Sequence, residues 1–405
     1  MPDFYVEKLF SDEVQSFMDK HRDHSAHELL LKYKNVGGIP ISTIVAQIAG
    51  RKKAMDKLPT WSRHQRIVYP PSINLEQASS ESTALYKAEL LRQEIKSAER
   101  IVDLTGGLGS DAYAFHTVFH SVDYVEPDKS LLEITKHNLS AMGATNIAYH
   151  NTTAEAYLDT ITDAHISQCY IDPSRRNNEG SRTLSLEDWQ PNVVALQPRI
   201  WELTDRLLVK CSPLLDIQEG IRKLNFVKSV HVVSVAGECK EILFNCLKGH
   251  ASEVEVHAVN LQTSDQPISF TPDMERNAKI TFSKPQRYLY EPNASVLKSG
   301  AFKIVAAKFD VAKLHPSSHF YTSERLVTDF PGRIFSVELE VKSDRKEILK
   351  FFPDERVNVI TRNYPLMVQA LRKKLKLKEG GDGYLIATTG PEKKHLLICQ
   401  KLNRL

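Results

Sequence analysis

The sequence predicts an α/β protein whose main feature is a doubly wound, mostly parallel sheet. Between residues 86 and 261, short apolar segments alternate with segments whose apolar residues recur at helical spacing. One apolar segment runs directly into a glycine-rich turn at 103–109 that opens a helix, which is typical of such sheets. We therefore expect a helical N-terminal region at 1–85, the α/β domain at 86–261, and small α+β modules at 262–330 and 331–405.

The first 85 residues carry apolar side chains at helical spacing. The segments VEKLFSDEVQSFMDKH, AHELLLKYKNV and ISTIVAQIAGRKKAMDKL each predict a helix. Ser11 and Ser25 precede two of these helices and are candidate caps. The polar, basic stretch 61–71 ends in two prolines and is predicted to be a connector.

Seven strands are expected in the α/β domain. They are ERIVDLTG, SVDYVEP, TNIAYHN, QCYIDPS, LLVKCSP, SVHVVSV and VEVHAVNL. Helical segments lie between the earlier strands, and the helix NVVALQPRIWELTDR is expected to be interrupted or restarted at Pro198.

The alternation weakens beyond residue 262. PISFTPD, KITFSK and FKIVAAKF indicate a small α+β, ferredoxin-like module at 262–330. FPGRIFSVELEV opens the last module as a strand, and helices and further strands follow it. Residues 333–405 hold 16 Lys and Arg against 9 Asp and Glu. The basic run RKKLKLK at their centre is either a contact for nucleic acid or a solvated helix face.

Composition is that of an ordinary globular chain. Of 405 residues, 41% are hydrophobic and 25% charged, and the net charge is +3. No apolar run approaches the ~18–20 residues that a membrane span needs, and the start lacks the pattern of a secretion signal. Five scattered cysteines without a Cys-x-x-Cys pair fit a reducing cytoplasm. The 15 histidines show no ligand spacing, so we expect no metal site.

The first motif is DLTGGLGSD, from Asp103 to Asp111. Its glycines allow a tight turn and leave room where a nucleotide must approach. Free N–H groups at the helix start can face a ligand's polar edge. Asp103 ends its strand, where doubly wound sheets bind ligands. A purely structural turn between strand and helix would need the same glycines.

The second motif is Glu126, which ends the strand SVDYVE about twenty residues later. A carboxylate at this position accepts hydrogen bonds from a ribose diol. These two motifs fit either a dinucleotide or S-adenosylmethionine, because Gly107-x-Gly109-x-x-Ala112 also satisfies the loose dinucleotide pattern.

The third motif, YIDPSRR, places Asp172 and Pro173 at the carboxyl end of the fourth strand. Proline fixes φ and directs the chain away from the strand. Asp172 and the carbonyls that follow can then hold an N–H donor and align its lone pair with a methyl sulfonium. The alternative is an Asp-Pro turn with exposed arginines.

In this order and spacing, DLTGGLGSD, VEPD and YIDPSRR resemble the motifs of class I S-adenosylmethionine-dependent methyltransferases. The resemblance covers residues 75–261 and implies a Rossmann-like, seven-stranded methyltransferase sheet. NLEQASSESTALYKA, SLEDWQPNV, VKCSPLLDI, LYEPNASVLKSGAF and NYPLMVQALRKKLKLKEGGDGYLIATT extend it. They resemble a bacterial group in which such a domain precedes a THUMP-like C-terminal domain, here 331–405. THUMP domains accompany enzymes that modify RNA, chiefly tRNA.

The resemblance implies roles for individual residues. Asp103, Thr105, Gly107 and Gly109 match the cofactor loop, and Glu126 matches the ribose-binding acid. Thr153 falls near the adenine-contact position, where many relatives have Asp, and Gln77 and Ser79 lie in a segment that closes over the cofactor. Helix capping by Ser79 or Ser80 is the structural alternative.

The catalytic motif departs from its family. Asp172, Pro173, Ser174 and Arg175 align with the Asn/Asp-Pro-Pro-aromatic motif of amino-methylating enzymes. Ser174 replaces the second proline, and Arg175 replaces the aromatic residue that would stack on a flipped base. Trp189 could supply that surface or be buried in the core. Arg175 and Arg176 could grip a phosphate or pair with surface carboxylates. Lys210 could face the site or solvent.

The leading hypothesis is a cytoplasmic methyltransferase that uses S-adenosylmethionine to methylate a base nitrogen in tRNA or rRNA, without a metal. Methylation of a protein is a variant of it. A non-catalytic RNA-binding protein on the same scaffold is the second hypothesis, motivated by Ser174 and Arg175. A nicotinamide-dependent oxidoreductase is the third, although it leaves the Asp-Pro motif unexplained. Thermal shifts with S-adenosylhomocysteine and with NAD discriminate the third from the others.

Overall fold

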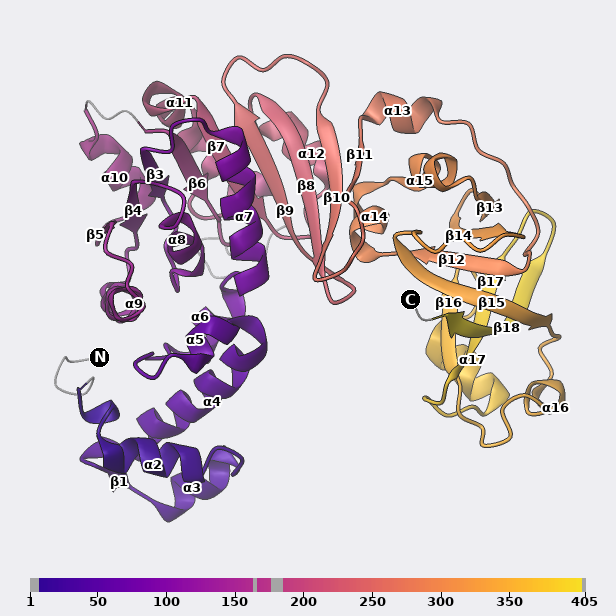
Figure 1. Cartoon of the computed structure of the whole chain (residues 1–405), viewed down its shortest axis with the longest axis horizontal. Helices are drawn as coiled ribbons and strands as arrows, with labels where there is room; N and C mark the ends of the chain where they lie inside the picture. Colours follow the sequence, from indigo (N-terminus) through magenta and orange to yellow (C-terminus); the bar gives the residue numbers. More distant parts are fainter. Residues whose placement is uncertain (1–6, 163–165, 176–184, 403–405) are drawn as a thin grey trace. The chain divides into compact units, whose positions relative to one another are not determined.

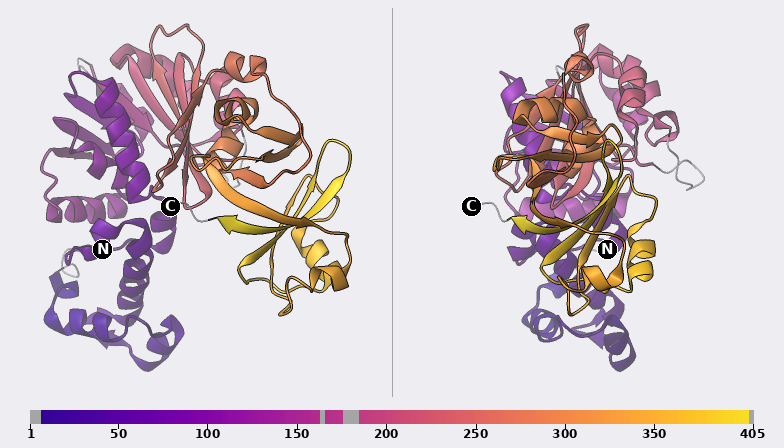
Figure 2. Two further views of the ribbon diagram at one scale, coloured as in Figure 1. Left: turned by 45° about the vertical axis from the view of Figure 1, so that its right-hand side comes forward. Right: turned by 90° about the vertical axis from the view of Figure 1, so that its right-hand side faces the viewer.

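The N-terminal region is helical, as the sequence predicted. The computed structural model describes residues 7–162, 166–175 and 185–402. The region contains α2 (Asp12–Lys20), α3 (Ala26–Lys32), β1 (Asn35–Val36), β2 (Ile39–Pro40), α4 (Ile41–Lys57), α5 (Pro59–Arg63) and α6 (Ser72–Gln77). Most of these elements are labelled in Figure 1, and the region is the indigo part of the ribbon in Figure 2. Ser25 caps α3 by accepting the Glu28 N–H at 3.2 Å. Ser11 stands at the N-cap position of α2, as predicted, but its hydroxyl donates to the carbonyl of Lys8 and makes no capping hydrogen bond.

The central sheet has nine strands and is mixed, whereas we expected seven strands. The strand order is β11-β10-β8-β9-β7-β6-β3-β4-β5. The strands are β3 (Arg100–Asp103), β4 (Ser121–Val125), β5 (Ile147–His150), β6 (Gln168–Ile171), β7 (Arg206–Cys211), β8 (Val227–Val235), β9 (Glu238–Leu247), β10 (Glu255–Leu261) and β11 (Ile268–Phe270). Strand β3 pairs in parallel with both β4 and β6, and β6 pairs in parallel with β7. All seven predicted strands are present.

Two strands were missed, for identifiable reasons. Strand β9 follows β8 after only Ala236 and Gly237, whose φ values of 51° and 82° suit a two-residue hairpin. The strand begins with the polar residues ECKE, so the sequence did not indicate a strand there, although the residues that follow are buried. Strand β11 pairs with β10 in antiparallel register, so the segment PISF adds a strand to the central sheet.

Helices follow most strands of this sheet, and Figure 1 shows α7 in front of the strands. The helices are α7 (Glu81–Glu94), α8 (Ser110–Phe115), α9 (Lys129–Ala141), α10 (Ala154–Thr160), α11 (Val193–Leu203) and α12 (Ile217–Lys223), with a short 3₁₀ turn η1 (Leu186–Asp188). Side-chain caps begin them at Ser80, Asp128, Thr153, Asn192 and Asp216. Helix α11 continues through Pro198, so the predicted interruption there was wrong.

The C-terminal part contains a second mixed sheet, of seven strands, in the order β13-β14-β12-β15-β18-β17-β16. Its elements are α13 (Pro272–Asn277), β12 (Tyr288–Pro292), α14 (Ala294–Ser299), α15 (Phe302–Phe309), β13 (Ala312–His315), β14 (Ser318–Ser323), β15 (Gly332–Glu340), α16 (Arg345–Ile348), β16 (Asn358–Arg362), α17 (Val368–Leu375), β17 (Gly383–Thr389) and β18 (Lys394–Leu402). Strand β12 pairs with β15, so one sheet crosses the expected boundary near residue 330.

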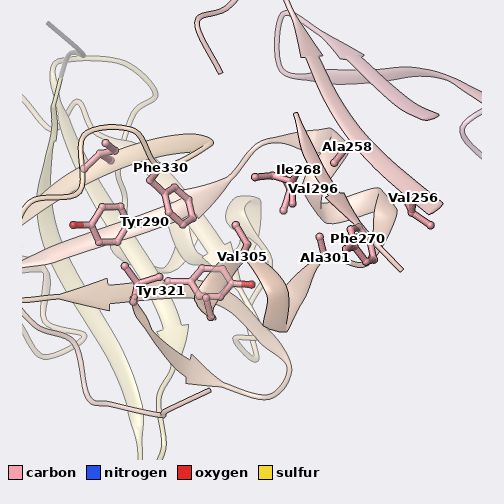
Figure 3. Packing of buried hydrophobic residues seen from close by; sticks show 13 residues of the cluster. Val256, Ala258, Ile268, Phe270, Tyr290, Val296, Ala301, Val305, Tyr321 and Phe330 are labelled. Atoms are coloured by element: carbon pink, nitrogen blue, oxygen red, sulfur yellow. The ribbon is translucent and has the colours of Figure 1, made fainter. Parts of the chain in front are cut away.

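Backbone contacts divide the chain into two compact units. The first runs to Val227 and includes Phe244–His250, and the second comprises Lys228–Leu243 and everything from Ala251 on. Within the second unit, a buried cluster joins β10 and β11 to α14, α15 and the second sheet (Figure 3). Phe270, Val296 and Phe330 are among its members. The finer boundaries at 85, 261 and 330 stay predictions. In the described residues, no helix is both long and apolar enough to cross a membrane.

Candidate active site

The carboxyl ends of neighbouring parallel strands bring the predicted motifs to one edge of the central sheet. Asp103 ends β3, Glu126 follows β4, and Asp172 follows β6. Backbone hydrogen bonds continue the pairing beyond the strands, from the Leu104 N–H to the Tyr170 carbonyl at 3.0 Å and from the Gly106 N–H to the Val125 carbonyl at 2.9 Å. This edge is where doubly wound sheets hold their ligands.

The three glycines of the turn have different tasks. A Cβ on Gly106 would lie 2.3 Å from the Tyr124 ring, and one on Gly109 would lie 2.5 Å from Thr135 of α9. These two glycines are therefore required by packing. Gly107 has φ +55°, and among the described residues a Cβ there would meet a single atom within 4 Å, the Thr105 carbonyl oxygen at 3.7 Å. Its free side is consistent with a ligand passing close to the backbone.

Glu126 is fixed by the backbone of this turn. Its Oε2 accepts the Gly107 N–H at 2.9 Å, and its Oε1 accepts the Asp128 N–H at 2.9 Å. The residue is only 8% exposed. Burial raises the pKa of the Glu126 carboxyl, and the two backbone hydrogen bonds oppose that shift. The carboxylate is thus held rigidly next to Gly107.

Asp103 presents an unsatisfied acceptor. Its Oδ1 accepts the Thr105 N–H at 3.0 Å, whereas its Oδ2 is buried and finds no hydrogen-bond partner within the described part of the chain. Burial, followed by the nearby Asp111 carboxylate, raises the pKa of the Asp103 carboxyl well above its usual range. A buried oxygen without a partner is costly, so a donor from a ligand would stabilise it.

Thr105 links the two acidic motifs. Its Oγ1 accepts the backbone N–H of Asp172 at 2.7 Å and lies 3.5 Å from Asp103 Oδ1. Asp172 itself is half-buried, and its Oδ2 is paired with Nζ of Lys210 on β7. The sequence left Lys210 open between the site and solvent, and the structure places it on the Asp-Pro corner.

The residues after Asp172 turn away from the strand. Pro173 is buried, Ser174 is exposed and Arg175 is half-buried. Ser174 and Gln190 exchange both backbone hydrogen bonds, from Ser174 N–H at 2.7 Å and from Gln190 N–H at 3.0 Å. The expectation for Arg176 lies outside the described residues.

Three other predicted residues differ in how far they are exposed. Thr153 is exposed and caps α10, accepting the Ala156 N–H at 3.3 Å. Gln77 is exposed at the end of α6. Trp189 is 0% exposed, which confirms the expectation of burial in the core over that of a stacking surface. The cofactor roles of Thr153 and Gln77 stay predictions.

Beneath the site lies a buried ionic cluster that the sequence analysis missed. Lys87 of α7 is 0% exposed, and its Nζ lies 3.1 Å from Asp111 Oδ1. Asp111 Oδ2 accepts the hydroxyls of Ser79 at 2.7 Å and Tyr170 at 2.8 Å. Lys87 lowers the pKa of the Asp111 carboxyl against the opposing effect of burial. The cap of α7 is Ser80, which leaves the Ser79 hydroxyl for this cluster.

Replacing Lys87 with methionine is expected to destabilise the first unit by about 3–5 kcal/mol, because Asp111 would remain as a buried charge without its cation. Urea unfolding followed by circular dichroism measures the change. The matched control is Arg92→Met on the same helix, whose solvent-exposed pair with Glu89 is expected to contribute little to stability. Equal stability of the two variants would contradict the assignment.

Two comparisons concern the C-terminal part. Residues 288–331 match a model of a ferredoxin-like domain, and residues 332–401 match a model of a THUMP domain-like family.

Among the described residues, no group of His, Cys, Asp and Glu side chains is placed to hold a metal ion.

The whole chain is similar to a solved structure of a presumed methyltransferase from Porphyromonas gingivalis W83, with 28% identity, a TM-score of 0.85 and 100% coverage of both chains. An rRNA methylase from Streptococcus thermophilus matches 40% of this chain and 94% of its own, at 14% identity and a TM-score of 0.30. A presumed methyltransferase from Streptococcus mutans, in complex with S-adenosylhomocysteine, matches 40% and 96%, also at 14% identity and a TM-score of 0.30. No curated protein matches.

The chain therefore has a methyltransferase fold combined with a THUMP-like C-terminal domain, as the motifs predicted. It shares its architecture from end to end with the Porphyromonas gingivalis protein.

Proposed function

We propose that this protein is an S-adenosylmethionine-dependent methyltransferase that methylates a base nitrogen in tRNA or rRNA in the cytoplasm. The observation that carries the proposal is the open side of Gly107, whose N–H is bonded to the buried Glu126 carboxylate, at the sheet edge where the buried Asp103 ends its strand. The Asp172-Pro173 corner is held to the same edge through Thr105.

The residues present fit this cofactor. It carries an amino group, which suits the unsatisfied Oδ2 of Asp103, and a ribose diol, which suits Glu126. Glu126 already accepts two backbone N–H groups, but carboxylate oxygens have further lone pairs for hydroxyl donors. Gly107 would let the adenosyl moiety lie against the backbone.

The chain's own residues would orient the acceptor. The bound sulfonium supplies an activated methyl group, so catalysis needs mainly alignment and exclusion of water. Asp172 and the Pro173 carbonyl would accept hydrogen bonds from the acceptor N–H. When bound, the cofactor would supply its methyl group to the acceptor nitrogen and leave as S-adenosylhomocysteine, and Asp172 or water would take the one proton that the nitrogen loses.

The C-terminal domain supports an RNA substrate. THUMP domains accompany RNA-modifying enzymes, and this one is basic, with Lys373, Lys374 and Lys376 exposed in and just after α17. Exposed lysines attract phosphates electrostatically, without sequence preference.

Mass spectrometry of nucleosides tests the proposal directly. RNA from cells with and without the protein is compared, and the purified protein is then given tritiated cofactor and the RNA from deficient cells. We expect one methylated nucleoside to be missing in the deficient cells and restored in vitro. Incorporation of tritium into protein alone would instead indicate a protein substrate.

A second candidate is a non-catalytic RNA-binding protein on this scaffold. The pairing of Lys210 with Asp172 favours it, because the carboxylate that should receive the acceptor already has a cationic partner. Under this alternative, the protein binds RNA but no methylated nucleoside changes in the same experiment.

Binding of S-adenosylhomocysteine is expected to strengthen as pH rises. Burial raises the pKa of the Asp103 carboxyl, so its protonated form persists to higher pH than that of an ordinary aspartate, and the ligand's ammonium group prefers the carboxylate. Binding therefore releases a proton below that raised pKa, and the gain in affinity levels off above it. Calorimetry in two buffers of different ionisation enthalpy measures the released proton. Asp103→Asn should bind more weakly without this release, and an unchanged release would contradict the role of Asp103.

A further inference from the structure

A second candidate site lies within the second unit, remote in sequence from the motifs above. A cavity of about 720 Å³ opens among the ends of β12, β15, β16 and β18 and the beginning of α14. Its volume is in the usual range for sites that bind small ligands, about 300–1,000 Å³. The charged side chains in its lining are Asp265, Glu291, Arg333, Arg362 and Lys401.

The wall of the cavity is organised by a buried carboxylate. Glu291 of β12 is only 3% exposed, and each of its oxygens faces a different arginine. Oε2 accepts Arg333 Nε at 2.8 Å and also Arg333 Nη2, and Oε1 lies 2.8 Å from Arg362 Nη2. Arg333 is the register partner of Glu291 on β15, whereas Arg362 ends β16. The carboxylate thus forms ion pairs with two guanidinium groups from different strands, and it is hydrogen-bonded to that of Arg333.

Both arginines still reach the cavity. Their side chains are 43% and 44% exposed, although the acid between them is buried. A guanidinium has five N–H donors, and Glu291 occupies only some of them. Arg333 is also held over the Phe335 ring, 5.8 Å from its centroid. Rigid, partly solvated arginines of this kind suit the oxygens of a phosphate better than a flexible lysine does.

The charge of the lining favours an anion. Three cations, Arg333, Arg362 and Lys401, line the cavity, whereas Glu291 and Asp265 are the two acids in its lining. Asp265 Oδ2 accepts the side-chain amides of Asn260 at 2.9 Å and Asn293 at 3.1 Å, so that oxygen is occupied within the wall. A phosphate would fill only part of the volume. The rest of the lining includes the apolar side chains of Leu297, Ile334 and Leu402, which suit a base.

We propose that this cavity binds the phosphate and base of one nucleotide, with Arg333 and Arg362 contacting the phosphate and Glu291 as their positioning residue. The nucleotide is either free or a unit of single-stranded RNA. The second source rests on the proposed function above, and the first does not.

Calorimetric titration of the full chain tests the site with three probes: inorganic phosphate, adenosine 5′-monophosphate and a short single-stranded RNA. The double variant Arg333→Gln/Arg362→Gln is expected to lose at least about tenfold in affinity for whichever nucleotide-bearing probe binds, since two charge-assisted contacts disappear. For RNA, the slope of log affinity against log salt should also become shallower.

The matched control is Arg325→Gln, which removes an arginine of the same unit that is 68% exposed and paired with Asp310 outside the cavity lining. It should change affinity less than twofold. Thermal unfolding of all variants checks that they fold. Glu291→Gln is expected to weaken binding, because the two arginines lose the residue that positions them. If charge attraction alone governed binding, removing this negative charge would strengthen the binding of an anion.

The titrations distinguish a free nucleotide from a unit of RNA as the ligand. Arginine-dependent binding of adenosine 5′-monophosphate that RNA does not displace supports a free nucleotide, and arginine-dependent binding of RNA supports an RNA unit. No binding by the wild type, or equal affinities in the double variant and the Arg325 control, overturns the site. Titration with S-adenosylhomocysteine reports on the methyltransferase site alone, so a failure there leaves the free-nucleotide result interpretable.

Discussion

Replacing Gly107 with valine is expected to abolish binding of S-adenosylhomocysteine, with a loss of affinity on the order of a hundredfold or more. A β-branched residue at φ +55° costs about 1–3 kcal/mol in backbone strain. Its side chain would also occupy the open side of Gly107, whose N–H is bonded to Glu126. Calorimetric titration with S-adenosylhomocysteine measures the loss.

The structure offers a matched control for the backbone effect. Gly143 has φ +84°, and in the described structure nothing would lie within 4 Å of a Cβ there. Gly143→Val therefore carries comparable strain away from the site, and we expect it to reduce thermal stability while preserving ligand affinity. If both variants bind like the wild type, the open side of Gly107 does not face the cofactor.

Replacing Asp172 with alanine is expected to reduce the rate of methyl transfer by about 10²–10⁴-fold, because the acceptor loses the group that orients it and can take its proton. The affinity for S-adenosylhomocysteine should change little, since Gly107, Glu126 and Asp103 are untouched. Single-turnover transfer of tritiated methyl to RNA, with calorimetry alongside it, measures both quantities.

Because Asp172 is paired with Lys210, a second variant of Asp172 is needed. Asp172→Ala leaves the largely buried Lys210, 13% exposed, without this carboxylate, and some loss could come from local rearrangement. Asp172→Asn keeps the side-chain volume and the hydrogen-bond acceptor but removes the charge. If Asp172 takes the proton, the asparagine variant is slow as well. If it only orients the acceptor, the asparagine variant retains much of the rate. Full turnover in the alanine variant would remove Asp172 from the mechanism.

The sequence located the elements of the α/β domain because their signals are local. Each predicted strand is a short apolar run, and the cap at Ser80 is satisfied within three residues of the chain. The glycine turn, Glu126 and Asp172 are likewise marked by their neighbours in the sequence. Parallel strands end at the same edge of a sheet. Knowing which strand each residue ends was therefore sufficient to predict that these residues lie close together.

What the sequence by itself determined is thus the class of fold and the acidic residues at the edge of its sheet. The tertiary structure alone decided which charges face one another: Lys210 with Asp172, 38 residues apart, Lys87 with Asp111, and both Arg333 and Arg362 with Glu291. The same holds for strands β9 and β11, which extend the sheet to nine. The reason is physical. Periodicity records which face of a local element is buried, whereas the partner of a buried charge depends on strand order and register, which distant segments set together.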